Sequence, residues 1–455
     1  MLNTNEGNAT MKIQIHGGRV LLPSGIRKTD IELEGGRIAS IGKLTRDPQA
    51  LHLSATGRYV LPGFIDLHAN GIAGFDLTNG EFNASTGRFS RKADLYLRGL
   101  ERALTTFALK GTTLVGFAIL EAPIAQLTKI FKLIARYREE HNGFPNDMFF
   151  GIYIEGTFIK EEASRGAHNP KYFQTPSVRL FKKLQRAANG NIRIVNVVPE
   201  WGAPALTLIQ YLSSQGIVCA TGHSITTGAQ YQPAIDRGST LAIHVMNGFS
   251  SSSAKPFHGG GVLETILLSD RVYAEIIADG FHVDKHYVMD IIERKGIDKC
   301  AIITDSMFVS GMKGMKEFQL SGIKGRVSNG GEYLHIADRR NALYGSVLTM
   351  DKAFQNVMDW FMTPMPGIWN RHHRAHTFEE ALFNTSQLCS TSAAKALGIY
   401  EPSTRGLDHN LSCGTGDIRV GKRADLVVAD IQRQRHQVRL TVHKTIVNGH
   451  VVAQK

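Results

Sequence analysis

The segment IVCATGHS, residues 217–224, contains the pattern that decides the fold. Its apolar and small side chains are typical of a buried strand, and His223 follows where that strand should end. Seven other short apolar runs recur along the chain, at residues 64–68, 112–117, 149–155, 192–199, 240–245, 273–278 and 300–305. The longer gaps between them hold helix-like sequence, for example residues 92–109 and 124–138. Eight such runs predict an α/β fold, a (β/α)8 TIM-like barrel.

Both ends of the chain show a different, β-rich pattern. Residues 12–60 alternate in short strand-like pieces, and GDIRVGKRADLVVAD (416–430) and TVHKTIVNGHVV (441–452) do the same. The two ends are therefore expected to pair with each other beside the barrel. The predicted division is a flexible tail at residues 1–11, a small β-sandwich domain of residues 12–62 and 406–455, and a barrel of residues 63–405.

The composition fits a globular enzyme. Of the 455 residues, 42% are hydrophobic and 20% are charged, which is ordinary for a folded protein and unlike a disordered chain. No apolar run reaches the ~18 residues that span a bilayer, and the first residues lack the order of a secretion signal. A cytoplasmic protein without a membrane partner is therefore expected. Cys219, Cys300, Cys389 and Cys413 show no paired spacing, which indicates reduced core residues.

The formal net charge of +12 raises three alternatives: a nucleic acid, an anionic membrane surface or an anionic small substrate. Basic residues are scattered along the chain. The densest patch, RHHR at residues 371–374, has no aromatic ladder or nucleic-acid motif around it. We expect a solvated basic surface and no nucleic-acid partner. Residues 362–376, which contain this patch, are interpreted as an irregular insertion late in the barrel.

Polar residues close several of the apolar runs. In a barrel of this kind the carboxyl ends of the strands meet at one mouth, so these side chains should lie together. A single His or Glu at such a place is an ordinary cap or loop residue. Together, however, Glu155, His223 and His244 offer one carboxylate and two imidazoles, a ligand set of catalytic zinc with an open position. Asp305, after the last run, would then serve as general base and later general acid.

Seven motifs carry a resemblance to a known family. They are PGFIDLHANG (62–71), IEGTFIKEEASRGAHNP (154–170), TGHS (221–224), HVMNGFSSSSAKPFHGGGV (244–262), IIADGFHVD (276–284), ITDS (303–306) and YGSVLTMDKAF (344–354). In this order they resemble the N-acetylglucosamine-6-phosphate deacetylases of the amidohydrolase superfamily. The similarity covers nearly the whole chain, including the terminal GKRADLVVAD typical of the superfamily's small β-domain.

This resemblance implies hydrolysis of the acetamide of N-acetylglucosamine 6-phosphate to glucosamine 6-phosphate and acetate, in amino-sugar catabolism, by a homodimer. By motif match, Glu155, His223 and His244 are the ligands of one divalent metal per subunit, Zn²⁺. Asp305 corresponds to the catalytic acid and base, and His282 to the residue that polarises the amide carbonyl. The implied substrate-binding residues are His168, Asn247, Gly248, Lys255 and His258.

Three departures from the family pattern leave alternatives open. His68-x-Asn70 stands where two-metal members carry His-x-His, so a second metal site should be weak or empty. Lys255 stands where the family usually has an arginine, so phosphate could be held more loosely or replaced by another anion. The serines at 250–253 replace a less polar segment. The alternatives are a related amidohydrolase for another N-acyl amino sugar or N-acyl compound, and a non-catalytic sugar-phosphate-binding protein.

Overall fold

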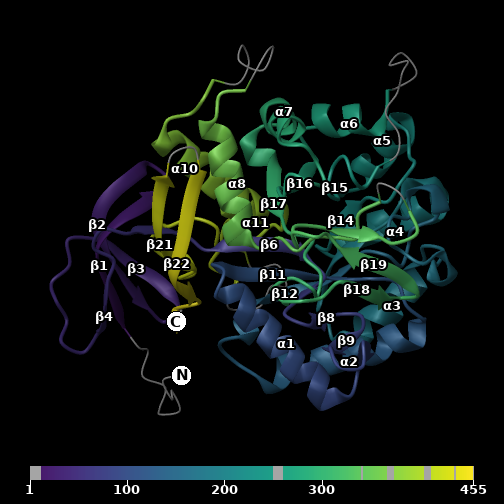
Figure 1. The fold of residues 1–455 in the computed structure, drawn as a ribbon, viewed down its shortest axis with the longest axis horizontal. Coiled ribbons are helices and arrows are strands. Elements are labelled where there is room, and N and C mark those ends of the chain that lie inside the picture. Colours follow the sequence, from purple (N-terminus) through teal and green to yellow (C-terminus); the bar gives the residue numbers. More distant parts are fainter. Residues whose placement is uncertain are drawn as a thin grey trace.

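A parallel barrel forms the centre of the molecule (Figure 1). The computed structural model describes residues 12–249, 260–339, 342–365, 374–403, 411–434 and 437–453. Its barrel strands follow one another in chain order: β6 (Phe64–Ala69), β11 (Thr112–Ile119), β12 (Phe149–Ile154), β13 (Ile192–Asn196), β14 (Val218–Thr221), β15 (Ser239–Ala242), β16 (Tyr273–Ile277) and β17 (Cys300–Ile303). All eight predicted runs are strands, and the (β/α)8 prediction is confirmed.

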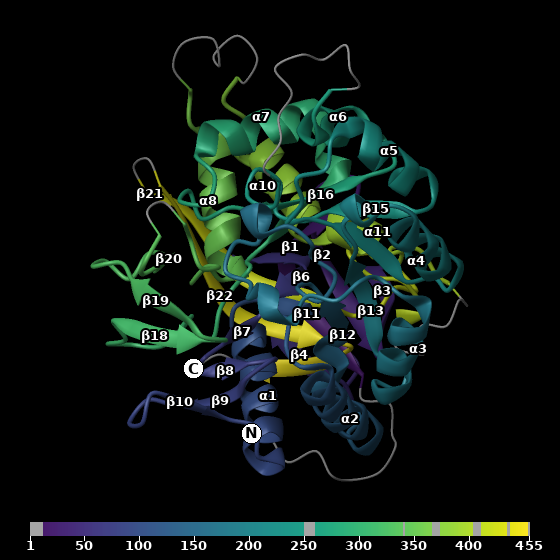
Figure 2. The ribbon, with the colours of Figure 1, turned by 90° about the vertical axis from the view of Figure 1, so that its right-hand side faces the viewer.

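Helices cover the outside of this barrel (Figures 1 and 2). They are α1 (Ala93–Ala108), α2 (Ile124–Glu140), α3 (Val178–Ala187), α4 (Ala203–Ser214), α5 (Gly228–Asp236), α6 (Val262–Leu268), α7 (Lys285–Lys295), α8 (Met350–Met362), α10 (Phe378–Ser386) and α11 (Ser392–Ala396). Because helices shield the strands on one side and barrel side chains fill the other, almost every strand residue is buried. This explains why the strands appear in the sequence as continuous apolar runs rather than as alternating patterns.

The barrel closes at a seam between β17 and β6. Here the main-chain N–H of Asp305 donates to the carbonyl of His68 at 2.9 Å. Below it, the buried Asp66 carboxylate accepts from the Thr304 N–H at 3.1 Å and from the Thr304 hydroxyl at 2.5 Å. The seam thus places His68 and Asp305, from opposite ends of the barrel sequence, next to each other.

Strands from both ends of the chain form a second sheet, at the left of Figure 1. Its members are β1 (Ile13–Leu22), β2 (Gly25–Glu34), β3 (Arg37–Gly42), β4 (Leu51–Ser54), β5 (Tyr59–Pro62), β21 (Leu426–Gln434), β22 (Gln437–Val447) and β23 (His450–Ala453). The antiparallel pairing of β5 with β21 joins the two ends in one mixed eight-stranded sheet. The predicted tail at 1–11 and the boundary at 406 lie outside the described residues.

Two small sheets beside the barrel had no counterpart in the sequence analysis (Figure 2). One contains β7 (Gly71–Ile72), β8 (Phe75–Asp76), β9 (Gly80–Asn83) and β10 (Arg88–Ser90); the other contains β18 (Glu317–Leu320), β19 (Ile323–Val327) and β20 (Leu334–Ile336). Their side chains share one apolar cluster, in which Phe82 and Phe318 both pack against Phe308. They are therefore packed against each other through residues that follow β17.

All four cysteines are buried, as expected of core residues. Within the described ranges, every helix is too short or too polar to cross a membrane.

A buried ionic joint connects the terminal sheet to the barrel. Arg423 is almost completely buried, and its Nη2 donates at 2.7 Å to the carbonyl of Asp147, in the short 3-10 helix (Asn146–Met148) that precedes β12. Its Nε lies 3.4 Å from Asp425 Oδ1. Asp425 also accepts from the Thr415 hydroxyl at 2.8 Å and from the Asn448 N–H at 3.0 Å. The Asp425 carboxylate therefore binds Thr415, Asn448 and the Arg423 guanidinium at once.

Replacing Asp425 by alanine should lower the free energy of unfolding by about 3–5 kcal/mol, because a buried guanidinium would lose its counter-charge. Asp425→Asn keeps an acceptor oxygen and should lose less. Urea unfolding followed by circular dichroism measures both changes. An Asp425→Ala protein as stable as the wild type would show that the joint does not stabilise the fold.

Candidate active site

A cavity of about 210 Å³ opens at the carboxyl ends of the barrel strands. Its polar lining residues are Asn70, Glu155, His168, His223, His244, Asn247, His282 and Asp305. Every one of these was singled out in the sequence, and they come from loops that follow different strands. His68 lies in the barrel interior beside this cavity and is inaccessible to solvent. Lys255, His258 and the serines at 250–253 lie outside the described residues.

One carboxylate oxygen forms the centre of the cluster. Glu155 Oε1 is surrounded by four imidazole Nε2 atoms: His223 at 3.2 Å, His68 at 3.4 Å, His244 at 3.5 Å and His168 at 3.6 Å. All five side chains are buried. Buried charge is unfavourable unless it is paired, so this concentration of ionisable groups marks the chemical centre of the cavity.

Three of the four rings are fixed from behind through Nδ1. His223 Nδ1 donates to the carbonyl of Ser164 at 3.0 Å, and His68 Nδ1 donates to Glu275 Oε2 at 2.9 Å. His168 Nδ1 donates to Glu121. Because carbonyl and carboxylate oxygens only accept hydrogen bonds, the proton belongs on Nδ1 of each ring. His223 is neutral near pH 7, so its Nε2 lone pair is available to a metal, whereas the neighbouring carboxylates outweigh burial and raise the pKa of His68 and, to about 10, that of His168.

Several site residues have strained backbone. His223, His244 and Asp305 have φ values of 54°, 22° and 48°, a region that costs non-glycine residues about 1–3 kcal/mol each. Neighbours hold these conformations in place. The Ser164 hydroxyl donates to the His223 carbonyl at 2.8 Å, and the Ser346 N–H donates to the Asp305 carbonyl at 2.8 Å. Such strain is found where a scaffold forces side chains into one cavity.

The charge states suit a cation. Burial opposes ionisation of Glu155, but the neighbouring His68 and His168 hold its pKa well below the usual range. Burial, with His168 nearby, lowers the pKa of His223 to about 4, and burial also lowers the pKa of His244. Near neutral pH the cluster thus offers an ionised carboxylate and two neutral imidazoles, the forms that bind metal.

The residues present fit a divalent metal ion. Ligand atoms of Glu155, His223 and His244 lie within 4.8 Å of one another. Two buried nitrogens, His68 Nε2 and His244 Nδ1, have no hydrogen-bond partner among the described residues. One carboxylate and two imidazoles match the donors of catalytic zinc sites that keep an open position.

Asp305 and His282 lie at the same mouth. Asp305 Oδ1 accepts from Asn70 Nδ2 at 2.7 Å, and burial together with the charge of Glu155 raises the Asp305 pKa to about 6. His282 Nδ1 donates to Asp279 Oδ2 at 2.6 Å, and the His282 N–H donates to Asp279 Oδ1 at 2.9 Å. Asp279 therefore fixes both the ring and the main chain of His282, which leaves Nε2 for the cavity.

The sequence analysis missed the residues that support the site, namely Glu121, Ser164, Glu275 and Asp279. Two of them left a signal. Glu275 is a charged residue inside the apolar run 273–278, and Asp279 directly follows that run. Glu121 and Ser164 lie in polar or mixed segments, where nothing local distinguishes them.

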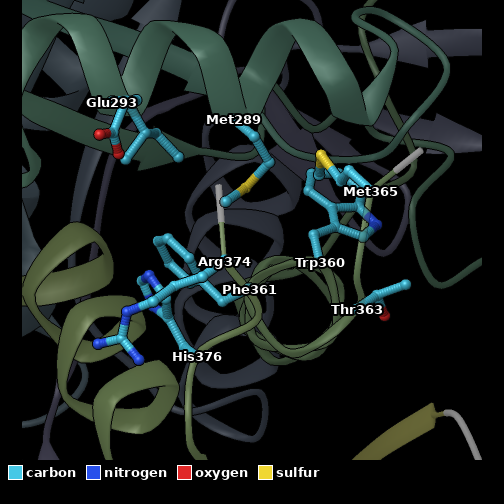
Figure 3. A pocket seen from close by; sticks show the side chains of 9 residues that line it. Met289, Glu293, Trp360, Phe361, Thr363, Met365, Arg374 and His376 are labelled. Atoms are coloured by element: carbon cyan, nitrogen blue, oxygen red, sulfur yellow. The ribbon is translucent and has the colours of Figure 1, made fainter. Parts of the chain in front are cut away.

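A separate small crevice lies between α7 and α8, away from this cluster (Figure 3). Met289, Trp360 and Phe361 form part of its wall. His376 stacks on Phe361 with ring centroids 4.7 Å apart, and Arg374 pairs with Glu380. The predicted insertion therefore packs its end against α8, while residues 366–373 lie outside the described residues. None of the crevice-lining residues belongs to the Glu155 cavity.

Known proteins with similar sequences carry one and the same name. An N-acetylglucosamine-6-phosphate deacetylase from Lysinibacillus sphaericus is 27% identical over 430 residues, covering 93% of both chains. The protein of the same name from Danio rerio is 26% identical over 458 residues, covering 96% of both. No protein-family model matches the chain.

Solved structures show the same fold. A mutant N-acetyl-D-glucosamine-6-phosphate deacetylase from Mycobacterium smegmatis, in complex with N-acetyl-D-glucosamine-6-phosphate, has a TM-score of 0.76 at 23% identity, covering 98% of this chain and all of that one. The deacetylase from Pasteurella multocida has a TM-score of 0.76 at 22% identity, with the same coverage. A D-hydantoinase is more distant, with a TM-score of 0.57 at 14% identity, and covers 98% of this chain and 96% of that one. Sequence and fold therefore agree over almost the whole chain with those of N-acetylglucosamine-6-phosphate deacetylases, in line with the resemblance that the motifs carry.

Proposed function

We propose that the protein hydrolyses the acetamide of N-acetylglucosamine 6-phosphate to glucosamine 6-phosphate and acetate. The observation that carries this proposal is the convergence of four imidazoles on Glu155 Oε1, with Asp305 and His282 at the same cavity. Relatives carrying the deacetylase name match the chain over nearly its full length. The family resemblance supports a cytoplasmic homodimer that acts in amino-sugar catabolism.

In this proposal Glu155, His223 and His244 hold one Zn²⁺ per subunit. When bound, the metal supplies Lewis-acid chemistry: it polarises the amide carbonyl and lowers the pKa of a water molecule to about 7. The Nε2 atoms of His223 and His244 lie 3.2 and 3.5 Å from Glu155 Oε1, close enough for the three residues to hold one ion together. Asn70 is a poor candidate for a second metal, because its amide oxygen is a weaker ligand for a borderline metal than the imidazole of a histidine.

Asp305 and His282 move the protons and stabilise charge. Asp305 accepts a proton as water attacks the amide carbon, and then returns it to the nitrogen as the carbon–nitrogen bond breaks. Asp279 holds His282 by Nδ1, and the Nε2 side of the ring, which lines the cavity, stabilises the oxygen that becomes negative. Asn70, which donates to Asp305 Oδ1, orients that carboxylate. The products are acetate and the free amine.

Substrate recognition falls to the mouth of the cavity. His168 and Asn247 line it, and Asn247 Nδ2 donates to the carbonyl of His282 at 3.1 Å. Gly248 follows Asn247 and packs against the His244 ring. Lys255 is proposed to contact the phosphate, and His258 is a further proposed substrate-binding residue. Lys255 also supports a second candidate, deacylation of a different N-acyl amino sugar, because lysine lacks the bidentate fork with which arginine binds phosphate.

We expect metal removal to abolish activity. Dialysis against a chelator should stop acetate release from N-acetylglucosamine 6-phosphate, and one equivalent of Zn²⁺ per chain should restore it. Parallel assays with unphosphorylated N-acetylglucosamine and with N-acetylgalactosamine 6-phosphate test the substrate. A metal-loaded protein that ignores all three sugars would contradict the proposed substrate and favour the second candidate.

Replacing Asp305 by asparagine should lower kcat by about 10²- to 10⁴-fold, because the amide cannot accept and return the proton. Its zinc content, measured by mass spectrometry, should remain near that of the wild type. Steady-state acetate release gives kcat and KM. An Asp305→Asn protein with unchanged turnover would rule out Asp305 as the base, and a wild-type protein that binds the sugar phosphate without turnover would be a binding protein.

A further inference from the structure

Glu275 is a buried acid for which the proposed chemistry has no use. It lies on β16 with apolar neighbours on both sides in the sequence, and it is inaccessible to solvent. It does not line the active-site cavity. Since a carboxylate in a barrel interior is unfavourable without specific partners, its presence requires an explanation.

One oxygen of Glu275 receives both of its hydrogen bonds. Oε2 accepts from His68 Nδ1 at 2.9 Å and from the main-chain N–H of His244 at 3.3 Å. The other oxygen, Oε1, has no hydrogen-bond partner among the described residues. Glu275 is therefore aimed at two residues of the Glu155 cluster, which come from β6 and from the loop after β15.

Each of these two hydrogen bonds affects a residue beside the proposed metal site. With Nδ1 of His68 held by Glu275, the opposite nitrogen Nε2 lies 3.4 Å from Glu155 Oε1 and 3.7 Å from Asp305 Oδ1. His244, a proposed ligand, has a φ of 22°, and its N–H is held in that strained position by the same oxygen. The Tyr153 ring packs against His68 at 4.7 Å between centroids and restricts its movement.

We propose that Glu275 is a positioning residue for the metal centre: it fixes the His68 ring and the His244 main chain, so that affinity for a divalent ion depends on it. The inference rests on the metal site of the proposed function, and it concerns metal binding rather than the substrate. Partners behind metal ligands typically change metal affinity by about 10- to 100-fold when they are removed.

The test compares metal affinity in three variants of the full chain. Glu275→Leu removes both acceptors, whereas Glu275→Gln keeps one acceptor oxygen and is the conservative replacement. Asp425→Asn is the matched control, because it makes the same acid-to-amide change at a buried carboxylate in the joint between the barrel and the terminal sheet. Zinc dissociation constants come from competition with a chromophoric chelator. The visible absorption of the Co²⁺-loaded proteins reports ligand geometry.

We expect Glu275→Leu to weaken zinc binding by about 10- to 100-fold, with Glu275→Gln between it and the wild type, and the Co²⁺ spectrum to change. Asp425→Asn should bind zinc as the wild type does, although it is less stable. If Glu275→Leu fails to fold, Glu275→Gln decides by itself. The inference is overturned if the zinc dissociation constant of the Glu275 variant is less than three times that of Asp425→Asn.

The two proposals fail in different ways. A wild-type protein that binds zinc but releases no acetate overturns the proposed function, and the zinc affinities of the variants still decide the role of Glu275. A wild-type protein that binds neither zinc nor Co²⁺ overturns both.

Discussion

The rest of the site depends on one constraint: an ionised carboxylate, Glu155, is buried at the mouth of the barrel. Solvent cannot stabilise its charge, so the protein must, and it does so mainly through His68 and His168, whose Nε2 atoms lie 3.4 and 3.6 Å from one Glu155 oxygen and whose own pKa values are raised. Imidazoles in such a place need partners in turn. Glu121, Glu275 and the Ser164 carbonyl each hold one ring by Nδ1. The imidazoles therefore surround Glu155, and a second set of acceptors lies behind three of them.

To bring these side chains together, the backbone adopts strained conformations at several site residues. Strained residues such as His223 and Asp305 persist only where the surrounding structure over-determines them. At Asp305 that support is the seam, where hydrogen bonds to His68 and from Ser346 fix the main chain on both sides. The seam is therefore part of the site: it joins the first and last strands and brings the proposed proton carrier beside the cluster.

The fold and the principal site residues could be predicted because their signals are local. Strands buried on both faces must be apolar, so each barrel strand was visible as a run, and a polar residue at its end was visible as an exception. Glu275 and Glu121 could not be assigned in this way. Glu275 and its partner His68 are 207 residues apart in the sequence, and Glu121 and His168 are 47 residues apart. Only the folded structure shows that these residues are in contact. The small sheets β7–β10 and β18–β20 were missed because their strands are short and lie between longer elements.

The residues proposed for the chemistry and those proposed for substrate specificity lie in different parts of the chain. Glu155, His223, His244 and Asp305 each follow a barrel strand within two residues, so the barrel itself fixes their positions. Substrate contacts in such barrels are commonly made by loops, which vary freely on a constant scaffold. Here the segment with Lys255 and the serines departs from the family pattern in its sequence, whereas Glu155, His223 and His244 match it. A pocket that loses a bidentate contact discriminates less strongly between anions, while bond cleavage uses the same groups. The proposed amide hydrolysis therefore depends on residues that the barrel fixes, and the proposed choice of substrate depends on residues outside the barrel strands.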